Sequence, residues 1–491
     1  MSKKLKFVFF AYESYPYPLA KHLIDEGHEV IIGVIKSINE LELPGVKDDE
    51  SAKEKQQRLS VYDGIVLKNT FGQVLTFLQS VPKAEKGDYF LFFDHSNLYN
   101  ISETCMKMGF KNGLFPTKWY YRMERERILA KKYVEDNYPE LHVSPSFDFK
   151  TIKDGIAHME SNEECVYVLK SNGNVGKTVV PTSDDVEVCR EMITGALEKG
   201  KSDYESGGFL LEEKITNALE VTPIMVFYNG EYVYSLVELE NKEFGAGNIG
   251  VQKGGSQGLN VRTPQHCEMN EIAFPPCVYE LAKKQPGLAI FDVGLLYDGE
   301  KFFFTEFCAM RYGWDGMFSE CVMRDDDKPF VGNYFQDIID GKNPLINEFG
   351  ASVRLFNLHG KGEYTYESPD DIDVDWSDSA EDNLFWYLIK QKGDDIVTAG
   401  GPDHLCVATG ASDVLSTAVA LAYQAVDAVN FEKLYYRPKF DFLSMDYDSS
   451  ILNRYAAIKP FIVEETGEEK DEKDDKDEKD VKEENGDKNE D

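Results

Sequence analysis

The sequence predicts an α/β protein of several domains, with a parallel sheet at its start and α+β subdomains after it. The chain has 491 residues, which is long enough for two to four domains. Its hydrophobic content of 42% and aromatic content of 13% are typical of a globular protein with a large core. Over residues 1–112, apolar runs of strand length alternate with segments of helix length, which indicates a parallel sheet covered by helices.

Residues 1–112 are therefore predicted to form a Rossmann-like domain. The expected strands are Lys6–Ala11, His28–Val34, Tyr62–Leu67 and Tyr89–Asp94, and the expected helices are Pro18–Glu26 and Thr76–Val81. Gly27 ends the first helix. The turn over residues 11–18 contains no glycine, although Rossmann-type sheets often carry a glycine-rich phosphate-binding turn after the first strand.

The middle of the chain, 113–330, mixes long strands with charged helices. The expected helices are 119–138, Asp184–Lys199 and Pro276–Lys284, and the expected strands are Val166–Lys170, Thr178–Val180, Gly208–Lys214, Glu220–Val237, Ala289–Leu296 and Lys301–Cys308. A glycine-rich stretch, Gly245–Gly258, interrupts this pattern.

The last part of the chain divides into a folded region, 331–463, and an acidic tail, 464–491. The folded region is expected to hold the strands Ser352–Leu358, Asp395–Ala399, Leu405–Ala408 and Leu434–Arg437 and the helix Ser412–Val429. The tail has 16 acidic and 6 basic residues and almost no apolar ones, so it cannot bury a core and is predicted to be disordered. A solvated extension is favoured over an interaction tail.

Composition excludes several classes of function. The net charge of −35 argues against nucleic-acid binding, which needs a basic face. No apolar run of 18 residues exists, so no membrane span is expected, and the start of the chain does not resemble a signal peptide. The eight cysteines are scattered without a C-x-x-C pair, which indicates neither a zinc site nor disulfides. We therefore expect a cytoplasmic protein.

The segment Leu169–Val180 is the strongest candidate for binding a polyphosphate. It reads as a strand ending in Lys170, a turn with Gly173, Gly176 and Lys177, and a second strand. Such a turn can bring backbone N–H groups and ammonium groups close to phosphates. It is not a P-loop, because Asn172 stands where the first glycine is needed. A β-hairpin with surface lysines would show the same pattern, so the segment alone leaves both readings open.

Carboxylates follow at suitable intervals downstream. Glu212 and Glu213 end a strand before Ile215, and such an extended segment can hydrogen-bond an adenine; only one of the two side chains can face it, because successive side chains alternate. Glu220 opens the next strand. Asp292 and Glu306 lie on two strands joined by a short turn, which brings them together at one end of the sheet. Two carboxylates beside a polyphosphate are typical of a Mg²⁺ site.

Taken in sequence order, the segment Leu169–Val180 and the carboxylates after it resemble the ATP-grasp fold, in which two α+β subdomains close on ATP. Among proteins with this fold, the chain most resembles the glycinamide ribonucleotide synthetases (phosphoribosylamine–glycine ligases). The resemblance runs nearly end to end. The similar segments are Gly113-Leu-Phe-Pro-Thr-Lys, Lys170 to Val180, Leu211 to Val221, Glu306-Phe-Cys-Ala-Met-Arg-Tyr-Gly, Val397-Thr-Ala-Gly-Gly, Val407-Ala-Thr-Gly-Ala-Ser-Asp, Ala422-Tyr-Gln-Ala-Val and Tyr435-Tyr-Arg-Pro. It implies a Rossmann-like domain (1–112), an ATP-grasp domain (113–330, with subdomains at about 113–205 and 206–330) and a small β-rich C-terminal domain (331–463).

The resemblance also implies roles. ATP with Mg²⁺ or Mn²⁺ would be used to activate a carboxylate, such as glycine, as an acyl phosphate that an amine attacks. The implied nucleotide-binding residues are Arg127, Lys170, Gly173, Gly176, Lys177, Glu212, Glu213, Ile215 and Glu220, and the implied metal ligands are Asp292 and Glu306. The implied catalytic residues are Lys170, Lys177 and Arg311, of which Arg311 would pair with the substrate carboxylate. Gly245–Gly258 would be a mobile lid.

Three departures bear on the substrate. Residues 11–18 lack the family's glycine-rich loop, Cys308 replaces its asparagine ligand, and Gly313-Trp-Asp-Gly replaces its Gly-Asp-Pro-Glu. We therefore expect an ATP-dependent carboxylate–amine ligase with an altered amine substrate, acting as a monomer or homodimer. An orthodox phosphoribosylamine–glycine ligase of purine biosynthesis and a non-catalytic binding module are the alternatives.

Overall fold

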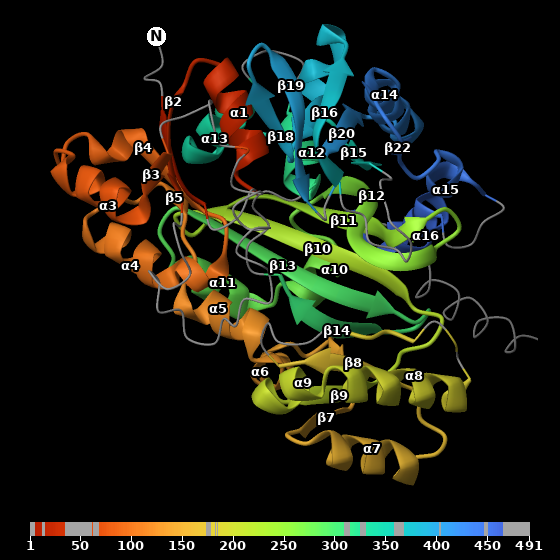
Figure 1. Cartoon of the computed structure of the whole chain (residues 1–491). Helices are drawn as coiled ribbons and strands as arrows, with labels where there is room; N and C mark the ends of the chain where they lie inside the picture. Colours follow the sequence, from red (N-terminus) through yellow and green to blue (C-terminus); the bar gives the residue numbers. More distant parts are fainter. Residues whose placement is uncertain are drawn as a thin grey trace, which may run out of the picture.

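The structure is a computed structural model of the chain (Figure 1). It describes residues 5–11, 15–34, 61, 68–172, 178–181, 183, 185–308, 315–324, 330–357, 368–401, 404–445 and 450–464. Within these ranges, fifteen strands form one large mixed sheet, and two smaller sheets of four and three strands accompany it. The predicted mixture of parallel and antiparallel α/β architecture is confirmed.

One half of the large sheet is the parallel sheet of the N-terminal region. Its strands are β1 (Lys6–Ala11), β2 (Glu29–Val34), β3 (Lys68–Thr70), β4 (Tyr89–Phe93) and β5 (Gly113–Leu114). The helices around it are α1 (Tyr17–Asp25), α3 (Phe71–Ser80) and α4 (Tyr99–Lys107), with the short 3₁₀ helices η3 (Lys86–Asp88) and η4 (Ser96–Leu98). Phe9 lies opposite both Ile32 and Phe92 in parallel register. Apolar side chains on both faces of β1 and β4 are buried, as in sheets covered on both sides.

The other half is antiparallel and carries most of the middle of the chain. Its strands are β10 (Leu219–Tyr228), β11 (Glu231–Gly245), β12 (Ile249–Thr263), β13 (Leu288–Tyr297) and β14 (Phe302–Phe307), with β6 (His142–Val143) at the edge of β14. The helices of this part are α10 (Glu268–Ala273), α11 (Pro276–Ala282), α12 (Asp315–Val322) and α13 (Phe330–Ile339). Leu288 of β13 pairs with Leu114 of β5, which makes the two halves one sheet.

A separate three-stranded sheet projects from the large sheet, next to β14 (Figure 1). It consists of β7 (Ser146–Phe149), β8 (Tyr167–Ser171) and β9 (Phe209–Glu213), with helices α7 (Ile152–Ser161), α8 (Val186–Lys199) and α9 (Lys201–Gly207). This sheet and its helices bury a separate hydrophobic core, to which Leu169, Ile193 and Phe209 belong. Two helices, α5 (Lys118–Arg125) and α6 (Arg127–Asn137), connect the N-terminal region to it.

The C-terminal part does not fold as an isolated block. Four of its strands, β15 (Phe349–Asn357), β17 (Leu384–Trp386), β20 (Cys406–Ser412) and β22 (Leu434–Tyr435), belong to the large sheet, which β15 joins through the pairing of Ala351 with Leu259 of β12. The remaining elements are β16 (Ser368–Trp376), η5 (Asp378–Asn383), β18 (Ile389–Lys392), β19 (Asp395–Gly401), α14 (Leu415–Asp427), β21 (Val429–Phe431), α15 (Phe440–Leu443), α16 (Ile451–Ile458) and η6 (Lys459–Phe461).

Several expected elements differ from the structure; among them, the region Glu220–Val237 is two antiparallel strands, β10 and β11. The helix predicted over 119–138 breaks at Glu126, whose φ of −97° and ψ of 75° are not helical. The strand predicted at Thr178–Val180 is a single bridge between Val179 and Leu169. The glycine-rich stretch Gly245–Gly258 is a β-hairpin of β11 and β12, so the prediction of a loop there was wrong.

Two further predictions, the strand Tyr62–Leu67 and the disordered tail, fall almost entirely outside the described residues. Among the residues that are described, no helix combines the length and the apolar character needed to cross a bilayer.

Candidate functional site

Charged side chains from both sheets meet between the three-stranded sheet and β13–β14 of the large sheet. The strands β8 and β9 reach this region from one side and β14 from the other, with α6 beside them (Figure 1). The cations lie at 127, 131, 170 and 242, and the carboxylates at 212, 220, 292 and 306. Such a concentration of charge between two sheets needs either mutual pairing or a ligand.

Glu212 is the centre of a buried triad. Its Oε1 accepts a hydrogen bond from Lys170 Nζ at 3.1 Å, and its Oε2 lies 2.8 Å from Lys131 Nζ. All three side chains are about nine-tenths buried. Burial, together with the neighbouring charge of Lys170, lowers the pKa of Lys131, while Glu212 opposes this shift. Two ammonium groups sharing one carboxylate leave a net positive charge.

A second pair joins α6 to β14. Arg127 Nη1 donates to Glu306 Oε2 at 2.9 Å, and Arg127 Nε donates to the Ser171 carbonyl at 3.3 Å. The side chains of Arg127 and Glu306 are 20% and 42% exposed, so this pair is open to solvent. Burial alone would raise the pKa of Glu306, but the charges of Arg127, Lys170 and Lys242 outweigh it and lower the pKa to about 2. Glu306 is therefore ionised at any working pH.

Asp292 and Glu306 lie on one face of the β13–β14 pair. Gly294 is opposite Glu306, and the N–H of Cys308 donates to the Asp292 carbonyl at 3.1 Å, so the two carboxylates are diagonal neighbours. Their oxygens suit Mg²⁺ or Mn²⁺, whereas the soft thiol of Cys308 does not. Among the described residues, no group of three or more His, Cys, Asp or Glu side chains is placed to hold a metal ion.

The remaining predicted residues are Glu220, Glu213 and Ile215, which the structure describes, and four that it does not. Glu220 forms an ion pair with Lys242, with 2.6 Å between Oε1 and Nζ. Glu213 and Ile215 follow Glu212 on the same segment and are partly exposed. Gly173, Gly176, Lys177 and Arg311 lie outside the described residues, so their predicted roles remain predictions.

Sequence reasoning gave no role to Lys131 or Lys242. Lys131 follows Arg127 by four residues on a helix, a spacing that places both on one face, so a signal was present. Lys242 stands two residues after Glu240 and four after Glu238 on β11, so all three side chains lie on one face of the strand. No local pattern tells which partner each of them takes.

The hairpin predicted as a lid is fixed to the C-terminal part. Asp441 accepts hydrogen bonds from the Gly247 N–H at 3.1 and 3.2 Å. Arg437 donates to the Glu243 carbonyl at 3.0 Å, to Asn248 Oδ1 at 2.9 Å and to Asp441 at 3.1 Å. Arg437 and Asp441 are completely buried. We call this set the hairpin clamp.

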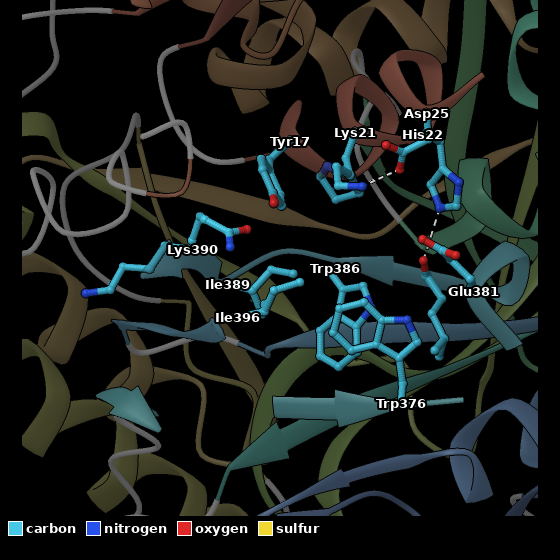
Figure 2. A pocket seen from close by; sticks show the side chains of 13 residues that line it. Tyr17, Lys21, His22, Asp25, Trp376, Glu381, Trp386, Ile389, Lys390 and Ile396 are labelled. Atoms are coloured by element: carbon cyan, nitrogen blue, oxygen red, sulfur yellow. Dashed lines mark hydrogen bonds and ion pairs between the residues drawn. The ribbon is translucent and has the colours of Figure 1, made fainter. Parts of the chain in front are cut away.

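A mostly apolar cavity lies elsewhere, between α1 and the C-terminal strands. Figure 2 shows Tyr17 and Lys21 on one side and Trp376, Trp386 and Ile389 on the other. At its edge, His22 Nε2 is 3.0 Å from the Leu384 carbonyl, so this nitrogen carries the proton. Burial lowers the pKa of His22 to about 4. The cavity shares no residue with the charged cluster and offers little polar surface for a polyphosphate.

No protein-family model matches the chain, and no curated protein sequence does either. Solved structures do. Phosphoribosylamine–glycine ligase from Thermotoga maritima is similar over 88% of this chain and 99% of that chain, at 16% identity and a TM-score of 0.59.

Two carboxylases are similar as well. Biotin carboxylase from Campylobacter jejuni matches over 92% of this chain and 99% of that chain, at 12% identity and a TM-score of 0.56. Pyruvate carboxylase from Rhizobium etli matches over 92% of this chain but 40% of that chain, at 12% identity and a TM-score of 0.56. The predicted architecture is thereby confirmed, and this chain has the ATP-grasp fold.

Proposed function

We propose that this protein is an ATP-dependent ligase that joins a carboxylate to an amine through an acyl phosphate, with an amine other than phosphoribosylamine. The observation that carries the proposal is the convergence of Arg127, Lys131 and Lys170 opposite Glu306 between two sheets. The similar Thermotoga maritima protein is a phosphoribosylamine–glycine ligase, and the similarity covers 88% of this chain. The departures at residues 11–18 and at Cys308 support a different amine.

In this proposal the chain supplies charge and position, and no side chain acts as a nucleophile. Lys170 and Lys131 would stabilise the phosphates of ATP, because buried cations interact strongly with anions in a low-dielectric site. The segment Glu213–Ile215 would receive the adenine, and Glu220 would lie nearby. The substrate carboxylate attacks the γ-phosphate, ADP leaves, and the amine then displaces phosphate from the acyl phosphate. Arg311 would orient the carboxylate by a two-pronged contact.

Asp292 and Glu306 are the residues that would hold a divalent cation. When bound there, Mg²⁺ or Mn²⁺ would neutralise phosphate charge. Glu306 is ionised already, so no proton has to leave it for this purpose.

The test is Mg²⁺-dependent phosphate release from ATP, first with glycine plus phosphoribosylamine and then with a panel of amino acids and amines. Release with other pairs only would support the proposal. Release that needs glycine and phosphoribosylamine together would make the protein an orthodox purine enzyme, and no release with any pair would indicate a binding module.

Lys170→Ala is the matching loss-of-function variant. Turnover should fall by about 10²–10³-fold, as when one preorganised charge or donor is removed. The fold should survive, because Glu212 keeps Lys131 as a partner. Lys153→Ala, an exposed lysine on α7 of the same subdomain, is the control and should keep full turnover. A folded Lys170→Ala protein with normal turnover would refute the assignment.

A further inference from the structure

The contact between Arg127 and Glu306 links two parts of the chain that the fold brings together from 179 residues apart. Arg127 is the first residue of α6, directly after the break at Glu126. Its Nε is held by the Ser171 carbonyl at the end of β8, and its Nη1 reaches Glu306 on β14. The guanidinium therefore bridges the three-stranded sheet and the large sheet within the charged cluster.

Other cations of the cluster are bound to carboxylates different from Glu306. Lys131 and Lys170 share Glu212, and Lys242 is 2.6 Å from Glu220. Arg127 is thus the cation in direct contact with the carboxylate that is expected to bind metal. Both members of the pair are partly exposed, at 20% and 42%, so an incoming ligand can reach either one.

A guanidinium and a divalent cation compete for the same carboxylate oxygens. While Arg127 occupies Glu306 Oε2, a metal at Glu306 would meet a fixed positive charge 2.9 Å from its ligand atom. A polyphosphate offers the guanidinium an alternative partner, since its fork of donors matches phosphate as well as carboxylate. Moving Arg127 from Glu306 to a phosphate would free the carboxylate when the nucleotide arrives.

We propose that Arg127 makes divalent-cation binding at Glu306 conditional on a bound polyphosphate. In the nucleotide-free protein the Arg127 guanidinium stands in for the metal on Glu306, and it passes to the phosphates when nucleotide binds. Arg127 is a positioning residue in this scheme. The inference rests on the proposed function and adds an order of binding to it: nucleotide before, or together with, the metal.

The experiment measures Mn²⁺ binding to the full chain by calorimetry and by the loss of the free-ion electron paramagnetic resonance signal. Glu306→Gln serves as the baseline, because a net charge of −35 attracts divalent cations non-specifically. Without nucleotide, wild type should match this baseline, and Arg127→Met should bind Mn²⁺ at least about tenfold more tightly than the baseline. Arg127→Met/Glu306→Gln should lose that gain. Arg122 lies on the neighbouring helix α5 and forms an exposed ion pair with Glu126. Arg122→Met is the matched control and should behave as wild type.

A second measurement adds a non-hydrolysable ATP analogue. Wild type should then bind Mn²⁺ above baseline, and Arg127→Met should gain much less from the analogue. Mn²⁺ binding to nucleotide-free wild type above the baseline, or no gain in a folded Arg127→Met, would overturn the inference. Arg127→Lys, which keeps the charge and removes the fork, replaces Arg127→Met if the latter does not fold, and an intermediate gain is expected.

The proposed function and the proposed role of Arg127 can be refuted independently of each other. The gain in Arg127→Met is measured without nucleotide, so it does not depend on turnover. Absence of any thermal shift with the ATP analogue would count against the proposed function, whatever the nucleotide-free Mn²⁺ results are.

Discussion

Two regions of the molecule hold ion pairs inside the protein, and they differ in how completely the charges are satisfied. In the hairpin clamp, Arg437 and Asp441 are fully buried, and the guanidinium nitrogens contact a carboxylate, a carbonyl and an amide oxygen. In the charged cluster, Arg127 and Glu306 are partly exposed, and two lysines share one carboxylate. The chemistry of the groups is the same in both regions.

This difference distinguishes charged groups that hold the fold together from charged groups that can still contact a ligand. A saturated pair such as Arg437–Asp441 has no capacity for a ligand unless native contacts break, so it holds β11–β12 on the C-terminal part. A carboxylate shared by two lysines, as Glu212 is, leaves ammonium donors that a further anion can satisfy. Sharing and exposure, more than the presence of charge, support the proposal that the cluster is the binding region.

The largest effect is expected from breaking the clamp. Arg437→Met leaves Asp441 charged and fully buried, so the free energy of unfolding should fall by about 3–5 kcal/mol in urea titrations. The double variant Arg437→Met/Asp441→Leu should recover part of this loss, because no buried charge is left alone. A loss below about 1 kcal/mol in the single variant would place the clamp among the dispensable surface pairs.

The next largest effect is expected when the pH is lowered, because buried titratable groups then change their contribution to the free energy of unfolding. The pKa of His22 is about 4 in the folded protein against 6.5 ordinarily, so the unfolded chain binds the extra proton first. Stability from this group is complete above pH 6.5 and is lost as the pH falls towards 4, by about 3 kcal/mol in total.

The measurement is the difference in urea unfolding between wild type and His22→Gln at pH 7 and pH 4. This difference cancels groups that shift in the opposite direction, such as Glu240, whose pKa is raised to about 7 by burial and by Glu238. Glu306, with a pKa of about 2, stays ionised over this whole range. A difference that does not change with pH would show that the pKa of His22 in the folded protein is close to its ordinary value of 6.5.

The smallest effect is expected at Lys131. Lys131→Met keeps the length of the side chain and leaves Lys170 on Glu212 at 3.1 Å, so unfolding should change little. Affinity for an ATP analogue should fall about tenfold, equivalent to about 1.4 kcal/mol, in isothermal titration. Unchanged affinity together with reduced stability would move Lys131 from the binding cluster to the structural pairs.

The sequence singled out several residues of the candidate site because its strands follow simple periodicity. Lys170, Glu212 and Glu306 stand at positions where a charge interrupts a buried strand, which is costly without a partner. The pairing of Arg127 with Glu306 could not be predicted, because contacts across 179 residues depend on how the two sheets pack.

The glycines of β12 explain the error at the hairpin. A Cβ atom at Gly255 would lie 2.4 Å from Glu240 Oε1, and one at Gly258 would lie 2.7 Å from Ser352 Oγ. These glycines permit close approach of neighbouring groups within the sheet, whereas the sequence pattern was interpreted as a flexible loop. Composition alone does not distinguish the two uses of glycine.

The pairing of β12 with β15 has a consequence for how the chain can be divided. Residues 257–261 pair with residues 349–353, so a chain ending near residue 330 would present β12 as an uncovered border of the large sheet. Unpaired N–H and C=O groups along such a border recruit other strands and promote aggregation. The C-terminal part therefore cannot be removed as a detachable module, and a shortened version of this protein would be expected to accumulate as insoluble material.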